Sequence, residues 1–143
     1  MDIEEVINRI ELFIERNGVN KGRGVATYTV VRKVEKVLDI NFGPQLIQYV
    51  MEYGYLGYDS IELFGIYTIN AWEHTDMVKE TLYLRHNFPA TQKLVALENR
   101  GDGDYFLVDS DDYVYEYDTE VDELRKTNQT LFEYILSRFK SVY

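Results

Sequence analysis

The residues of this 143-residue chain that could carry chemistry are concentrated in one acidic segment, residues 98–123. The segment holds eleven acids against a single base, Arg100, so it accounts for the whole formal net charge of −10. The rest of the chain balances at fourteen acids and fourteen bases. A proposed function therefore has to explain a local charge. The acids are Glu98, Asp102, Asp104, Asp109, Asp111, Asp112, Glu116, Asp118, Glu120, Asp122 and Glu123.

A calcium loop is the first chemistry that such a segment suggests. Asp109, Asp111 and Glu120 fall at the first, third and last positions of an EF-hand loop. The position that requires glycine in that loop holds Val114, and the flanking residues have the pattern of strands rather than helices. We therefore expect no EF-hand, and no resident metal or other cofactor.

Catalytic arrangements are equally poorly supported. His74 and His86 are too far apart in sequence to bind zinc from one helical face. No serine lies in a Gly-x-Ser-x-Gly turn, and the absence of cysteine removes a thiol nucleophile. No two acids stand out as the acid and base of a glycosidase. The glycine-rich loop Gly18–Gly24 lacks the Lys-Ser/Thr pair of a phosphate-binding loop. We expect a protein that is not an enzyme.

Three strands must position the acids. The apolar or aromatic runs Leu94–Leu97, Tyr105–Val108 and Tyr113–Tyr117 are separated by two turn sequences, Asp102-Gly103 and Asp109–Asp112. This pattern predicts a three-stranded antiparallel meander. In a regular third strand its alternate tyrosines share one face. Either that face is exposed, with the tyrosines as binding anchors, or it packs on helices and leaves Val114 and Glu116 outward.

The rest of the chain reads mainly as helices that would enclose this sheet. Periodic apolar residues and capping signals predict five of them, at 2–17, 29–38, from Pro44 to Gly54, 75–86 and 130–140. In the second helix we expect Val30, Val34, Val37 and Leu38 to face inward. A further strand, Ile61–Ile69, is interrupted at Gly65. The fold class is therefore α+β: a mainly antiparallel sheet, with its meander towards the C-terminus, flanked by several helices in one domain, residues 1–143.

The amino-acid composition limits where in the cell the protein is expected and what it is expected to bind. The absence of cysteine suits a reducing cytosol, and the charged N-terminus has no apolar stretch of a secretory signal. No apolar run reaches the roughly 20 residues that cross a bilayer. We expect a cytoplasmic protein without a membrane partner. Direct nucleic-acid binding needs clustered Lys and Arg, which are missing, so a basic protein is the more natural partner.

Several motifs, in this order, resemble the SUKH superfamily, which includes fungal regulators of cell-wall synthesis and many bacterial immunity proteins. One is a helix with a Val-Glu-x-x-Leu signature followed by a Pro-led helix that ends in Tyr-Gly. Another is a Phe-Gly-Ile strand, and a third is a Gly-Asp-Gly-Asp-Tyr hairpin before a closing helix. They lie at Val34–Leu38, Pro44–Gly54, Ile61–Ile66, Val95–Asp109 and Phe132–Leu136.

The resemblance implies an immunity protein that binds and neutralises a cognate toxin, often a nuclease domain, in the cytoplasm of the producing cell. It also implies that no catalytic residues are shared across the family. The charge supports this independently, because nuclease domains carry basic grooves for phosphate that an acidic surface could occupy. The alternative is a non-catalytic intracellular regulator or scaffold that binds a different protein, and we expect a monomer or a weak homodimer in either case.

The predicted binding surface combines tyrosine anchors with surrounding carboxylates. Its residues are Asp102, Asp104, Asp109, Asp111, Asp112, Tyr113, Tyr115, Glu116, Tyr117, Asp118 and Glu120.

Overall fold

The computed structural model describes residues 2–22, 26–66 and 76–141. Within them, five α-helices surround one antiparallel sheet of seven strands in sequential order. The predicted α+β class is confirmed. The sheet has two parts, because β3 and β4 pair only through Leu63 and Glu98. One part is the short strands β1 (Asn20–Lys21), β2 (Leu56–Tyr58) and β3 (Ile61–Leu63), and the other is the meander.

The meander is larger than predicted, with four strands instead of three. It comprises β4 (Val95–Gly101), β5 (Asp104–Val108), β6 (Tyr113–Asp118) and β7 (Glu123–Thr130). The sequence of β7, ELRKTNQT, lacks apolar alternation, and most of the strand is exposed. Its conformation comes from pairing with β6 rather than from burial of its own side chains.

Both predicted turns of the meander are confirmed. Asp102 and Gly103 have φ angles of 54° and 86°, as a primed two-residue hairpin turn requires. In the second turn, the Asp109 carboxylate accepts the backbone N–H of Asp111 at 2.9 Å, which is an Asx turn.

The helices are close to their predicted positions. They are α1 (Ile3–Asn17), α2 (Tyr28–Leu38), α3 (Pro44–Glu52), α4 (Met77–Asn87) and α5 (Leu131–Lys140). The side chain of Asp2 caps α1, and Thr130 with Glu133 forms a capping box on α5. One prediction for α2 is wrong. Val37 was expected to face inward but is 60% exposed, and Val31 is buried instead.

The strand predicted at Ile61–Ile69 ends at Leu63, and its last three residues lie outside the described part of the chain. A Cβ at Gly65 would stand 1.5 Å from the carbonyl oxygen of Gly54, so no side chain fits here. The backbone instead makes a single bridge to Asp76, the N-cap of α4.

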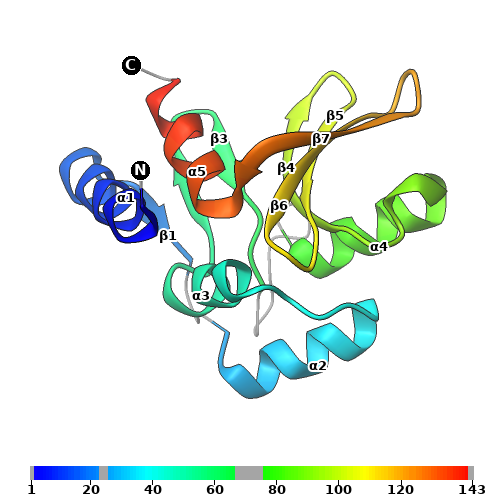
Figure 1. Ribbon diagram of the computed structural model, residues 1–143, viewed down its shortest axis with the longest axis horizontal. Coiled ribbons are helices and arrows are strands. Elements are labelled where there is room, and N and C mark those ends of the chain that lie inside the picture. Colours follow the sequence, from blue (N-terminus) through cyan, green and yellow to red (C-terminus); the bar gives the residue numbers. More distant parts are fainter. Residues whose placement is uncertain (1, 23–25, 67–75, 142–143) are drawn as a thin grey trace.

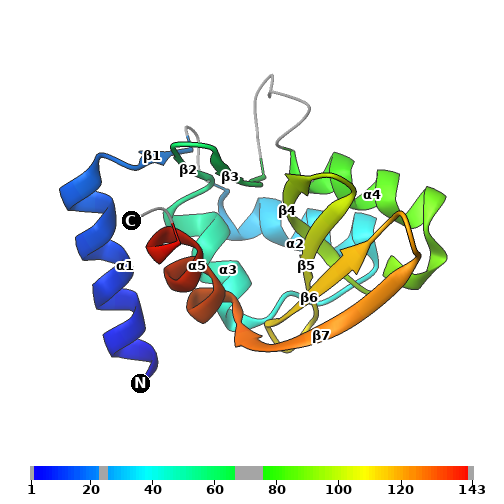
Figure 2. The same cartoon turned by 90° about the horizontal axis from the view of Figure 1, so that it is seen from above.

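The helices are distributed unevenly around the meander (Figures 1 and 2). Helix α4 runs along β4, while α5 packs at the other end beside α1, with Phe13 and Phe139 stacked at 4.8 Å. The far end of the β6–β7 hairpin projects beyond the helices (Figure 1).

Candidate partner-binding surface

The strand register assigns each meander residue to one of two faces, because directly opposite residues share a face. Tyr105, Leu107, Tyr115 and Tyr117 share the first face. This face packs towards α4, where Phe88 makes an edge contact with Tyr117 at 5.5 Å between ring centroids. Phe106, Glu116 and Arg125 share the second face, and Phe106 stacks on Tyr134 of α5.

Two of the turns meet at the projecting end of the meander. Thr119, in the β6–β7 turn, donates both its backbone N–H and its hydroxyl to the carbonyl of Gly103, in the β4–β5 turn, at 2.9 Å each. This places several carboxylates on one rim, which we name the acidic end. Its members are Asp102, Asp104, Asp118, Glu120, Asp122 and Glu123.

A row of three like charges crosses the acidic end. Asp104 is directly opposite Asp118, and Asp118 is directly opposite Glu123 on the outer strand. Neighbouring strands are about 4.8 Å apart, so the carboxylates repel one another. Partial burial, followed by the negative charges of Glu116 and Asp118, raises the pKa of Asp104.

Two arginines lie near this row, and each already has an intramolecular partner. Arg125 pairs with Glu116, directly opposite on β6. The guanidinium of Arg100 stacks over the Phe106 ring at 4.2 Å from its centroid. The acidic end therefore keeps an excess of negative charge.

The opposite end of the meander has a structural role that the sequence did not reveal. Asp112 is 3% exposed, and its carboxylate accepts the backbone N–H groups of Gln45 at 2.9 Å and Leu46 at 3.0 Å. It thus caps the N-terminus of α3, where partial positive charge stabilises a carboxylate. A Cβ on Gly43 would lie 2.4 Å from this carboxylate, so the position requires glycine. The expected surface position of Asp112 is wrong.

The tyrosines also differ from their expected roles. Tyr117 is fully buried, and burial together with a hydrogen bond to Asp122 raises its pKa to about 12. It cannot serve as a surface anchor. Tyr115 is half-buried and donates its hydroxyl to Asp109, while Tyr113 is exposed below the ammonium of Lys126. Val114 is buried rather than outward.

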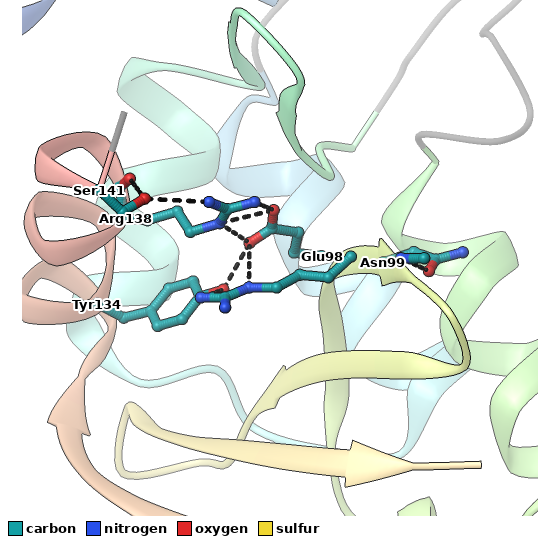
Figure 3. Close-up of polar contacts among 7 residues, drawn as sticks. Glu98, Asn99, Tyr134, Arg138 and Ser141 are labelled. Carbon is teal, nitrogen blue, oxygen red and sulfur yellow. Dashed lines mark hydrogen bonds and ion pairs between the residues drawn. The ribbon is translucent and has the colours of Figure 1, made fainter. Parts of the chain in front are cut away.

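The sequence also missed a buried ion pair, shown in Figure 3. Glu98 is 1% exposed and receives the Arg138 guanidinium from α5, with Nε to Oε2 at 3.0 Å and Nη2 to Oε2 at 2.9 Å. The Tyr134 hydroxyl donates to the same carboxylate. Burial raises the pKa of Tyr134, and the charge of Glu98 raises it further. One acid of the segment is thus neutralised internally.

The predicted surface residues therefore divide into four groups. Asp112 and Tyr117 are interior, and Asp109 and Tyr115 stabilise the turn. Asp111 and Tyr113 are exposed near that turn. The remaining five gather at or beside the acidic end, where the structure adds Asp122 and Glu123; they are Asp102, Asp104, Glu116, Asp118 and Glu120.

Other chemistry finds no support in the described residues. They contain no group of three or more His, Asp or Glu side chains that could hold a metal ion. His86 is exposed on α4, and His74 lies outside the described ranges. Of the helices described, none is long and apolar enough to cross a membrane.

Comparison with known proteins now identifies the family. Residues 3–140 match the sequence model of SUKH_5, described as "SMI1-KNR4 cell-wall". The chain belongs to this family. The resemblance of the helix, strand and hairpin motifs to the SUKH superfamily is thereby confirmed, and the match spans nearly all of the described residues.

A solved structure agrees with the SUKH fold. It is a protein from Pseudomonas syringae pv. tomato that is 16% identical, with a TM-score of 0.66 over 92% of this chain and 94% of that one. Identity at this level supports the shared fold alone. No curated protein matches the chain.

Proposed function

We propose that this SUKH protein is a non-catalytic immunity protein that binds a basic bacterial toxin, a nuclease domain, and occludes its active-site surface in the cytoplasm of the producing cell. The acidic end is the contact surface. The carboxylate row Asp104–Asp118–Glu123 is the observation that carries the proposal, because three like charges on adjacent strands repel one another and a basic partner would relieve that repulsion.

The family and the charge distribution support the same interpretation. SUKH membership brings the immunity function as a family expectation, and the excess charge lies at the end of the meander that points away from α5 (Figure 1). Complementary potentials accelerate encounter between an acidic rim and a basic groove, and they matter most at low salt. A nuclease groove that normally holds phosphates presents the matching charge.

The first experiment tests neutralisation directly. The genes beside this one are searched for a large secreted protein with a C-terminal nuclease domain. The chain is then co-expressed with that domain, and growth and complex formation are measured. Rescue of growth together with a stable complex is the expected result. Absence of both would refute immunity and favour a regulator that binds another protein.

The second experiment tests the surface. Asp104→Lys/Asp118→Lys retains a like-charged pair between β5 and β6 but reverses its sign, and it makes the contact between position 118 and Glu123 attractive. The fold should therefore tolerate the change, while the external potential is altered. The control Glu15→Lys/Glu52→Lys makes the same change in net charge on exposed helical positions.

The association rate at low salt should fall at least tenfold for the first variant and much less for the control. Equal rates for both variants would show that net charge alone matters and would refute the acidic end as the contact surface.

A further inference from the structure

Strand β7 is the outer edge of the meander, and β6 is its only partner strand among the described residues (Figure 2). Pairing is regular from Glu123 to Lys126. The pairing is then interrupted by a bulge. Tyr115 lies opposite Lys126 and Tyr113 lies opposite Thr130, so the three β7 residues between Lys126 and Thr130 stand against the single β6 residue between Tyr113 and Tyr115. The bulge shortens the edge that is available for a further strand to these four residues.

We propose that this edge pairs with the same edge of a second copy, in an antiparallel two-fold arrangement with Leu124 opposite Leu124. Glu123 of each copy then faces Arg125 of the other. The proposal does not depend on the toxin or on the immunity function.

Strand geometry restricts the possible registers. In an antiparallel pair, two opposite residues both direct their backbone N–H and C=O towards the neighbouring strand, or both direct them away. These directions alternate along each strand. Under a two-fold axis, residue i faces residue j and j faces i, so both must have the same direction and differ by an even number. The axis must therefore pass beside a residue and not between two residues.

Four positions remain for the axis along the regular edge, and charge selects one. An axis at Glu123 places two carboxylates opposite each other, and one at Arg125 or Lys126 places two cations opposite each other. Only the axis at Leu124 produces two Glu–Arg pairs. Opposite charges directly across two strands stabilise pairing, whereas like charges destabilise it.

The selected register also resolves an unfavourable contact within each copy. Glu123 faces Asp118 on its inner side, and the face it shares with Glu116 and Arg125 carries the row of like charges. Arg125 pairs with Glu116 of its own chain, but its guanidinium is 69% exposed, so Arg125 of the second copy would also lie on the outer side of Glu123. This register therefore brings a cation beside the edge carboxylate of each copy.

The apolar side chains of the hairpin support this contact. Leu124 is 36% exposed and Val121 is 63% exposed, although both lie in a strongly charged segment. In the proposed register the two leucines meet at the axis. The turn acid Asp122 of each copy lies beside Lys126 of the other, so the two acidic turns do not meet.

A charge-swap experiment tests the register. Sedimentation equilibrium on the full chain should detect a dimer with a dissociation constant on the order of 100 µM, since one pair of short strands forms a small interface. Glu123→Arg and Arg125→Glu should each weaken it at least fivefold. Together in one chain they should restore it, because the cross-copy pairs become Arg–Glu. A double variant that stays as weak as the single variants would overturn this register.

Disulfide cross-linking through an introduced cysteine is specific, because the chain has no cysteine of its own. Leu124→Cys should form a disulfide-linked dimer in a glutathione redox buffer, since the two thiols meet at the axis. Leu82→Cys, at 44% exposure on α4, is the matched control and should remain largely monomeric. Self-pairing would be overturned if both variants cross-linked equally, or if the Leu124→Cys variant formed no more linked dimer than the control.

Discussion

At the residue scale, identical side chains in one acidic segment differ in what they do. Glu98 and Glu116 each pair with an arginine and share a face of the meander. Glu98 is buried with Arg138 and Tyr134, whereas the Arg125 that pairs with Glu116 is 69% exposed. A buried carboxylate that loses its counter-ion leaves an uncompensated charge, while an exposed pair is screened by water.

Removal of these two carboxylates should therefore have unequal effects. We expect Glu98→Ala to reduce the free energy of unfolding by about 3 kcal/mol, because Arg138 is left without its buried partner. Glu116→Ala should cost less than about 1 kcal/mol. Urea denaturation measures both values. Similar losses of stability in the two variants would contradict the view that the Glu98–Arg138 ion pair holds α5 against the sheet.

At the element scale, the β5–β6 turn and the N-terminus of α3 form one unit. The Asp112 carboxylate reaches backbone groups 66 and 67 residues away in sequence, and Leu131 at the start of α5 donates its backbone N–H to the Asp112 carbonyl at 2.8 Å. One residue thus fixes the starts of two helices relative to the meander. Asp112 is therefore buried and inaccessible to a binding protein, although it lies in a strongly acidic turn.

Substitution of Asp112 should destabilise the fold more than substitution of its neighbour. Asp112→Ala removes the cap of α3 and leaves buried N–H groups unpaired, which should cost about 2 kcal/mol. Asp112→Asn should lose less, because an amide oxygen still accepts and asparagine tolerates the φ of 67°. The exposed control, Asp111→Ala, should change thermal stability little. Equal melting temperatures for the alanine variants would refute the cap.

At the scale of the whole molecule, the net charge of −10 is divided between structure and surface. Glu98 and Asp112 serve the interior, while Asp109 and Asp111 lie at the β5–β6 turn. Glu116 pairs with Arg125, and the acidic end holds the other six acids of the segment. The fold thus tolerates repulsion at the rim that a binding partner would relieve. A measurable pH dependence of stability follows from this repulsion.

The raised pKa of Asp104 determines whether stability rises or falls with pH. The unfolded chain loses this proton at a lower pH than the folded chain, so stability falls as pH rises between the two pKa values. The cost is complete at neutral pH. Asp104→Asn should therefore stabilise the protein at pH 7 by about 0.5 kcal/mol, and the gain should vanish near pH 3. Glu15→Gln, exposed on α1, is the control; a gain independent of pH would contradict the charge explanation.

The sequence alone determined the local structure of this protein. Asp102-Gly103 specifies its hairpin through two positive φ angles, and the caps at Asp2 and Thr130 specify helix starts, because these signals act within a few residues. It also determined where the charge lies along the chain. The family motifs are combinations of such local signals, which is why the SUKH resemblance was visible from them.

The tertiary structure alone decided which acids are available. Glu98 is buried because α5, forty residues later, brings Arg138 to it, and Asp112 is buried because α3 begins beside it. Strand β7 exists because β6 pairs with it, without an apolar pattern of its own. Each of these outcomes depends on contacts between distant residues. The local sequence carries no signal for these contacts. They decide which acids of the segment stay on the surface.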